Sequence, residues 1–463
     1  MLLHWHVFNM DLVGYHVWRQ SETQTVINNF YKEDFNILHP RINDHADTDR
    51  IMRMEFPIMQ WLFALFYKIF GNDIIITRIL SFIIGLCSVW GVYTLCKNVF
   101  QNNAIAVIAA WTFNFSPLFY YYTLNPLPDN FALASAIWSV VFAFIYKRKA
   151  DIIYLLYSAL LLSLATLAKL PFILYGIVPF IILWVQRKNS SVLQFFGSLL
   201  LYILCIIPAF IWYIKVIPQW GGNVVIKGIF NTKEGLLSLL NILQGNLIST
   251  LPELLLNYGS VIFFITGLWL VFKKKRYKQK DFIVFIGWGT AVIAYFLYEL
   301  NAIGTMHDYY MLPFLPLLFL LVSYGAYHML LNSRKWVKYL AIFALLILPV
   351  TAFLRADSRW NPEDPLFEST YYKYKTQLRT LTPPNALCII GNDNSHFILL
   401  YYIDRKGWAF DNNKLDPAQL EYYISKGAGY LFTDSYIDTI AGIKQHLSQK
   451  IFYTGAVRVY KLK

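Results

Sequence analysis

The sequence contains little charge. Only 14% of its 463 residues are Asp, Glu, Lys or Arg, and 57% are hydrophobic. Ordinary soluble domains have about a quarter charged and roughly half apolar residues. Because the core of a soluble domain cannot absorb this excess of apolar side chains, the composition indicates an integral membrane protein.

The sequence also lacks the motifs of several function classes. It has four cysteines, and Cys388 is the only one outside the apolar segments, so no internal disulfide is available there. It contains no repeat, Walker loop, paired-cysteine zinc pattern or dinucleotide fingerprint. These absences argue against ATP-driven transport by this chain alone.

The most prominent feature of the sequence is its series of long apolar runs. Crossing the hydrocarbon layer of a bilayer takes about 20 mostly apolar residues, and backbone groups in lipid must bond within their own segment, which favours helices. No alternating pattern typical of a membrane barrel occurs. We predict about ten transmembrane helices, over residues 75–96, 103–121, 131–146, 151–168, 171–186, 192–217, 258–272, 282–298, 309–331 and 337–354.

The basic residues, which give a net charge of +13, gather in every second loop between these helices. They do not follow an amphipathic face with stacking aromatics, so nucleic acid is not an expected partner. Their distribution is typical of cytoplasmic loops. The loops concerned contain Lys147–Lys149, Arg187–Lys188, Lys273–Lys280 and Arg334–Lys338. The other segments are then expected outside the cytoplasm: 11–55, 122–130, 169–170, 218–257, 299–308 and the region after about 355.

The two ends of the sequence differ from its middle. Residues 1–10 are too short to span and carry no basic region, so we expect one further helix to precede them, which would make about eleven. We predict a transmembrane domain over 1–354 and a small extracytoplasmic α/β domain over 355–463. In the latter we expect strands at 386–391 and 429–433, helices at 395–404, 417–426 and 436–449, and a closing segment 453–462. The apolar spacing in the outside loop 218–257 suggests amphipathic helices on the membrane surface.

Ionisable residues occur in several of the predicted outside segments. The first loop, 11–55, is rich in them, and such a loop is often only solvated. Asp129, Lys169 and His307 lie near helix ends in three further segments. Charged groups close to the membrane are costly and are commonly kept for function.

Each of these three residues also has a structural explanation. Asp129 could simply stabilise a helix N-terminus. Lys169 could extend to the lipid headgroups, or it could bind a lipid phosphate as a point charge. His307 is compatible with a metal ligand, a proton shuttle, a phosphate donor or a buried hydrogen-bonded histidine.

Carboxylates and cations on the outside suit group transfer from a phosphate-bearing lipid. A carboxylate can take a proton from an attacking hydroxyl, while Lys and Arg stabilise the charge that develops on the departing phosphate. A lipid-linked donor carries its own activation, so no nucleotide is needed outside.

Ordered motifs give a more specific indication. They are WRQSET at 18–23, HPRIN at 39–43, EFPIMQWLFALFYKIFG at 55–71, TRILSFIIGL at 77–86, PD at 128–129, AKLP at 168–171 and HDYYMLPFLP at 307–316. In this order they resemble the GT-C membrane glycosyltransferases, in particular the branch of the protein O-mannosyltransferases and the lipid A aminoarabinose transferase. The resemblance covers most of residues 11–331.

The resemblance implies a polytopic helical bundle with an extracytoplasmic active site, a polyprenyl-phosphate sugar donor and an inverting single displacement. It implies catalytic acids at Glu22, with Asp11 as the upstream candidate, and at Asp129. The family's usual aspartate stands here as Glu22, which is one methylene longer. The implied donor-phosphate ligands are Arg19, Lys169 and His307, and the implied acceptor or orienting groups are Glu55, Tyr309 and Tyr310.

The sequence therefore predicts a mainly α, multi-pass glycosyltransferase of the plasma (inner) membrane and cell envelope, which transfers a hexosyl or pentosyl group to an extracytoplasmic lipid, glycan or protein. Its expected partners are the polyprenyl-phosphate sugar, the acceptor and the bilayer. No cofactor is certain, and a divalent cation is considered. Two alternatives stay open: a transporter or lipid flippase, and a ligase or polymerase of lipid-linked glycans.

Overall fold

The computed structural model describes residues 2–46, 48–189, 191–220, 228–231, 234–303, 307–411 and 414–463. These residues form two compact units. The first, here the helical unit, comprises Met54–Ile58 and Arg78–Ala356. The second, here the mixed unit, comprises Met1–Arg53, Met59–Thr77 and Asp357–Lys463. Most residues before Thr77, which the sequence places in the transmembrane domain, are therefore in the same unit as the C-terminal region.

Each of the ten predicted membrane segments overlaps a helix, but 103–121 is broken into the helices Asn103–Asn114 and Pro117–Tyr122, and the apolar helix Ile58–Phe70 was not among the predicted segments. Six of the ten are long and apolar enough to cross a membrane, and the other four are shorter apolar helices. The long helices are α3 (Ile74–Phe100), α6 (Pro128–Lys149), α9 (Val192–Val216), α13 (Ile283–Tyr298) together with η8 (Lys280–Phe282), α14 (Leu315–Leu330) together with η9 (Asp308–Phe314), and α15 (Lys335–Asp357). The shorter ones are α4 (Asn103–Asn114), α7 (Ile152–Ala168), η2 (Leu170–Gly176) with α8 (Ile177–Gln186), and α12 (Val261–Lys273). The chain is thus a multi-pass membrane protein.

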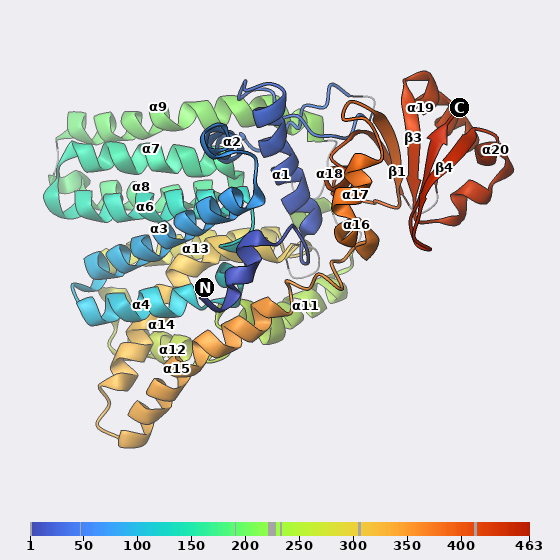
Figure 1. Cartoon of the computed structure of the whole chain (residues 1–463). Helices are drawn as coiled ribbons and strands as arrows, with labels where there is room; N and C mark the ends of the chain where they lie inside the picture. The colour runs from blue at the N-terminus through green and yellow to red at the C-terminus, as the bar shows by residue number, and fades with distance from the viewer. Residues whose placement is uncertain are drawn as a thin grey trace. The chain divides into compact units, whose positions relative to one another are not determined.

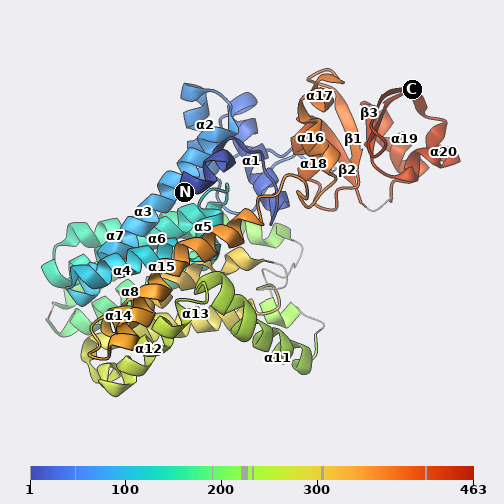
Figure 2. The same ribbon diagram turned by 60° about the horizontal axis from the view of Figure 1, so that its bottom comes forward.

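Polar residues set where several of these helices begin. The side chains of Asn102 and Asp151 accept backbone amides at the starts of α4 and α7, and Ser191 forms a capping box with Gln194 at the start of α9. Within the helical unit α6 packs on α7 and α7 on α9, and these helices run as neighbouring rows in Figure 1. Figure 2 shows α12, α13 and α14 together, with α15 beside them.

The predicted outside loop 218–257 is partly described. It contains η4 (Ile217–Trp220), η5 (Gly228–Asn231), α11 (Leu236–Gly245) and the π-helical η6 (Asn246–Leu255). The helical prediction for its second half is confirmed. Residues 221–227 and 232–233 lie outside the described part of the chain.

The mixed unit combines N-terminal helices with a C-terminal sheet. Its helical elements are η1 (Leu2–Asn9), α1 (Val17–Lys32), α2 (Ile58–Phe70), α16 (Ser369–Lys373), α17 (Lys375–Thr380), α18 (Ile398–Ile403), α19 (Pro417–Ser425), η10 (Tyr436–Thr439) and α20 (Ala441–Lys444). The five strands are ordered β2-β1-β3-β5-β4, with bounds β1 (Leu387–Gly391), β2 (Lys406–Phe410), β3 (Ala428–Thr433), β4 (Leu447–Tyr453) and β5 (Arg458–Leu462). Strand β1 pairs in parallel with β2 and β3, and β5 is antiparallel to β3 and β4.

Most predicted elements of this C-terminal region are confirmed. The strands at 386–391 and 429–433 correspond to β1 and β3, and the helices at 395–404 and 417–426 correspond to α18 and α19. The predicted helix 436–449 is wrong in its second half, because residues 447–453 pair with β5 as strand β4. Strand β2 was not predicted.

The first loop of the chain extends this sheet at its β2 edge. Asp44 forms an isolated parallel bridge with Gly407, the His45 amide donates to the Gly407 carbonyl at 2.7 Å, and the Gly407 amide donates to the Asn43 carbonyl at 3.1 Å. His396 reinforces the contact, since its two ring nitrogens lie 3.1 Å from Asp44 and 3.0 Å from Asp411. Pairing with residues 43–45 covers an edge strand that would otherwise be open.

Helices α12 and α14 approach closely at two glycines. A Cβ added at Gly325 would lie 1.9 Å from the Phe263 carbonyl oxygen, so substitution with Ala must push the helices apart. We expect Gly325→Ala to destabilise the protein by about 1–3 kcal/mol through overpacking. Gly289→Ala is the matched control, because its Cβ meets only the Leu317 side chain, at 3.7 Å. Melting temperatures in detergent should fall for Gly325→Ala alone; equal values for both variants would contradict this packing.

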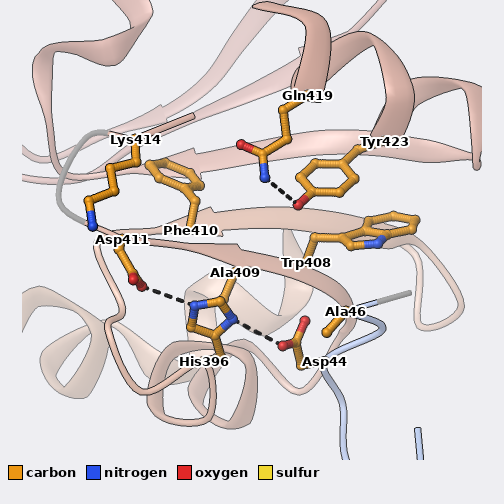
Figure 3. Close-up of a pocket in the computed structure, with 10 residues that line it drawn as sticks. All are labelled: Asp44, Ala46, His396, Trp408, Ala409, Phe410, Asp411, Lys414, Gln419 and Tyr423. Carbon is orange, nitrogen blue, oxygen red and sulfur yellow. Dashed lines mark hydrogen bonds and ion pairs between the residues drawn. The ribbon is translucent and has the colours of Figure 1, made fainter. Parts of the chain in front are cut away.

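The His396 contact predicts a pH-dependent stability. Hydrogen bonds to Asp44, opposed by burial and supported by Asp411, raise the pKa of His396 from 6.5 to about 9. The folded state therefore holds a proton that the unfolded chain loses, so the stabilisation is complete below pH 6.5 and is lost as pH rises to about 9. The contact lies beside a cavity, and among the described residues that line this cavity the one further charged side chain is that of Lys414 (Figure 3).

The measurement compares the wild-type protein with His396→Gln by thermal unfolding in detergent. We expect the difference in melting temperature to be largest below pH 6.5 and to shrink as pH approaches about 9. A difference that stays constant over that interval would show that the His396 charge does not contribute.

Candidate active site

An ion pair lies at the junction of two helix ends in the helical unit. Lys169 directly follows the last residue of α7. Its backbone is extended, and with Pro171 two positions later the chain turns there into the 3-10 helix η2. Asp129 lies in the first turn of α6, directly after Pro128. The Lys169 Nζ and an Asp129 carboxylate oxygen are 3.6 Å apart, and their side chains are only 14% and 3% exposed. Both charges are therefore largely removed from solvent and depend on each other.

Aromatic side chains of η9 (Asp308–Phe314) surround the lysine. The Lys169 Nζ lies 5.6 Å from the ring centroid of Tyr309 and 5.7 Å from that of Tyr310, which is the range of cation–π contacts. His307 packs on both rings, with centroids 5.4 and 4.9 Å away. The structure thus brings together five predicted site residues: Asp129, Lys169, His307, Tyr309 and Tyr310.

A further acid in this cluster was missed from the sequence. Glu299 directly follows α13 and is buried, with 3% of its surface exposed. Burial raises the pKa of Glu299 from 4.5 to about 7, and the charge of Lys169 opposes that rise. The sequence did contain one indication of Glu299, because this acid immediately follows an apolar span and begins the predicted outside segment 299–308.

The aromatic segment is held by polar contacts of its own. The Tyr122 hydroxyl donates to Asp308, and the ring of Tyr122 lies edge-on to that of Tyr309 at 5.9 Å. The Tyr175 hydroxyl donates to the Pro313 carbonyl at 2.9 Å. These bonds fix η9 at both ends, so the tyrosines that face Lys169 are positioned before any ligand binds.

Glu55 is placed by backbone contacts with the end of α7. The Phe56 amide donates to the Leu167 carbonyl at 3.0 Å, and the Trp212 indole donates to the Met54 carbonyl at 3.0 Å. Glu55 lies between these two anchors and is 8% exposed. A predicted acceptor or orienting carboxylate is thus buried in the helical unit, beside the end of the helix that leads into Lys169.

The remaining predicted site residues belong to the mixed unit. Arg19 and Glu22 form an ion pair along α1, and each side chain is 4% exposed. Asp11 contacts Lys375 and accepts a hydrogen bond from the Tyr401 hydroxyl at 2.5 Å. Asp11 therefore connects the N-terminal residues to the C-terminal region, and Glu22 is balanced by the predicted phosphate ligand Arg19. The predicted catalytic acids are divided between two units.

No group of three or more His, Cys, Asp or Glu side chains that could hold a metal ion occurs in the part of the chain that the structure describes. The pair of Asp129 and Lys169 has the composition of an anion-binding site with an adjacent base, because it places one fixed cation beside a carboxylate. The divalent cation considered from the sequence stays a prediction.

A known sequence family matches part of the chain. Residues 54–212 match the sequence model of the family described as dolichyl-phosphate-mannose-protein mannosyltransferase. Among proteins with curated descriptions, none matches the sequence significantly.

Solved structures match over nearly the whole chain. ArnT from Cupriavidus metallidurans bound to undecaprenyl phosphate has a TM-score of 0.67 at 14% identity, with 99% of this chain and 96% of that chain covered. Its apo state gives a TM-score of 0.66 at 13% identity and the same coverage. The arabinofuranosyltransferase AftD from Mycobacteria gives a TM-score of 0.56 at 12% identity, and covers 95% of this chain but 39% of that one. As the ordered motifs predict, the chain is a multi-pass membrane protein with the fold of the GT-C superfamily of membrane glycosyltransferases.

Proposed function

We propose that this protein transfers a sugar from a polyprenyl-phosphate donor to a hydroxyl-bearing acceptor on the extracytoplasmic side of the plasma membrane. The observation that carries the proposal is the buried pair of Lys169 and Asp129, with Glu299 and two tyrosines around it. The similar ArnT from Cupriavidus metallidurans has been solved with undecaprenyl phosphate bound, which supports a donor of this class.

The proposed reaction is a single displacement. The acceptor oxygen forms a bond to the anomeric carbon while the bond from that carbon to the phosphate oxygen breaks, so the configuration inverts and polyprenyl phosphate leaves. The acceptor proton passes to a carboxylate, for which Asp129 is the candidate in this unit and Glu22 is the candidate in the mixed unit. Lys169 stabilises the charge on the departing phosphate. His307, Tyr309 and Tyr310 orient the donor around it, and Arg19 and Glu55 are the further candidates for phosphate and acceptor.

An apolar groove in the same unit suits the isoprenoid chain of the donor. It has a volume of about 1060 Å³ and is lined mainly by Leu, Ile, Val and Phe side chains of η6, α12, α13 and α14. Phe296 and Phe314 line it, and Phe314 is the last residue of η9, which also carries Tyr309 and Tyr310. A lipid chain in this groove would therefore lie next to the segment that faces Lys169.

Asp129→Asn tests the proposed base. The amide keeps the shape of the side chain but cannot accept the proton, so we expect transfer to fall by about 10²–10⁴-fold. The assay incubates membranes with several polyprenyl-phosphate sugars, with and without a chelator, and follows donor consumption and the carrier lipid by mass spectrometry. Release of a monophosphate carrier supports the proposed donor class, and release of a diphosphate carrier supports a ligase or polymerase.

Asp151→Asn is the matched control. Asp151 caps α7 at its other end, and Asn caps helices as well as Asp, so protein level and activity should stay at wild-type values. Undiminished transfer by Asp129→Asn would remove Asp129 from the mechanism. Lipid movement between leaflets without donor consumption would favour the flippase alternative.

Glu299 predicts a pH dependence of donor binding. Because its pKa is raised to about 7, its negative charge appears as pH rises through that value. That charge competes with the donor phosphate for Lys169, so we expect the donor KM to increase above about pH 7. In Glu299→Gln the charge is absent at every pH, so this increase should disappear while kcat changes less. The same KM profile in both proteins would contradict a role for Glu299 at the phosphate site.

A further inference from the structure

The apolar groove of the helical unit has a charged end that the proposed reaction does not use. Near η9 the groove is lined by Phe314, and far from η9 it is lined by Arg276 and His328. The charged end lies where α12 and α14 end, at the predicted cytoplasmic loop Lys273–Lys280. Because the donor phosphate is proposed to bind at Lys169, beside η9, Arg276 is not part of that site.

The walls of the groove are accessible to an apolar chain. Leu268, Ile265 and Ile293 line it, and their side chains are 39%, 59% and 60% exposed. They come from α12 and α13, which lie together with α14 in Figure 2. Exposed apolar side chains along a groove between transmembrane helices suit the acyl chain of a lipid.

Arg276 and Lys274 supply positive charge at the charged end. Arg276 is exposed, and its Nη1 donates to the side-chain carbonyl of Gln279 at 3.4 Å. The Lys274 Nζ lies 3.2 Å from Nε2 of His328. An ammonium group can only donate, so this nitrogen of His328 accepts and the ring is neutral. Both contacts are made with neutral groups, so neither reduces the positive charge.

The acid at this end is already paired. Asp281 lines the groove, and its carboxylate lies 2.9 Å from the Nζ of Lys147, which belongs to another predicted cytoplasmic loop. The charge that remains at the groove end is therefore positive, and the complementary ligand is an anion. The guanidinium group of Arg276 has five N–H donors in a fork that matches phosphate oxygens, and one of them is used on Gln279.

We propose that this end of the groove binds an anionic phospholipid of the cytoplasmic leaflet, with its phosphate on Arg276 and Lys274 and one acyl chain along α12, α13 and α14. A phospholipid supplies both an anion and an apolar chain. Basic pockets between transmembrane helices on the cytoplasmic side are typical binding places for anionic headgroups. The phospholipid chain enters the groove from the Arg276 end and the donor chain from the η9 end, and the proposal does not rest on the glycosyltransferase activity.

Native mass spectrometry of the full chain, purified in detergent and stripped of lipid, tests the headgroup site. The probes are dioleoylphosphatidylglycerol, dioleoylphosphatidylcholine and inorganic phosphate. We expect phosphatidylglycerol to bind about fivefold more tightly than phosphatidylcholine, and Arg276→Gln to weaken its binding about fivefold, which is the factor that one basic residue contributes near an anionic headgroup. Lys278→Gln is the matched control, because it removes the same charge from η7 (Arg276–Lys278) at a position that is not among the described lining residues.

Gly289→Leu tests the path of the acyl chain. Gly289 lines the groove, and a Cβ there meets only the Leu317 side chain, at 3.7 Å, so a leucine side chain extends into the groove. We expect phosphatidylglycerol to bind about tenfold more weakly, because roughly two methylene groups of its chain lose their contacts. Gly197→Leu in α9 is the matched control, because a Cβ there meets nothing within 4 Å and Gly197 is not among the described lining residues.

Selective binding of phosphatidylglycerol that Arg276→Gln and Gly289→Leu weaken, and that both controls retain, supports the site. Equal weakening by Arg276→Gln and Lys278→Gln would show attraction by the net charge of the loop and overturn the site, as would equal binding of the two lipids. Wild-type affinity in Gly289→Leu overturns the groove as the place of the chain. Displacement of phosphatidylglycerol by an equal concentration of inorganic phosphate would identify a free anion as the ligand and overturn the lipid.

Discussion

The cost of removing charge from water governs where ionisable groups can lie in the helical unit. A buried charge without a partner is destabilising by several kcal/mol, and removal of one member of a buried pair costs about 3–5 kcal/mol. Lys169 and Asp129 meet this constraint by lying opposite each other at the ends of α7 and α6, with tyrosine rings over the ammonium group. Because the same contacts restrict both side chains, the pair is held at one place in the unit before a substrate arrives.

The same constraint explains the polar segment near the N-terminus, which appears in the sequence as a solvated loop. In the structure it contains the helix α1, most of whose residues are buried. Glu33 contacts Arg50 at 3.0 Å and Lys406 at 2.9 Å, and Arg19 pairs with Glu22. Much of the charge in this segment is therefore used to join parts of the mixed unit to one another.

The sequence predicted local structure well where a local cause decides it. Apolar length located ten of the apolar helices but not α2 (Ile58–Phe70), and the order of motifs indicated the fold. The prediction from sequence was wrong where contacts between residues far apart in the chain determine the structure. Residues 436–449 have isoleucines at helical spacing, yet β5 recruits residues 447–453 into the sheet through the turn at Gly455. Likewise Glu299 and His396 could be seen as ionisable, but their partners could not, since His396 and Asp44 are 352 positions apart.

Whether a residue is held by local or by distant contacts also determines what can be concluded when its substitution lowers activity. Asp11 bonds to Lys375 and Tyr401, so its replacement loosens the packing of the C-terminal residues and lowers activity through the fold whether or not it is catalytic. Asp129 begins a helix whose first turn is also set by Pro128 and by the Asn130 side chain bonded to the Asn125 carbonyl. An amide at position 129 therefore changes charge at Lys169 while the backbone retains its other supports. The amide also removes the negative partner of the buried Lys169 ammonium group, which is itself destabilising. Loss of activity is therefore informative about chemistry at Asp129, as at Asp11, only together with an unchanged melting temperature.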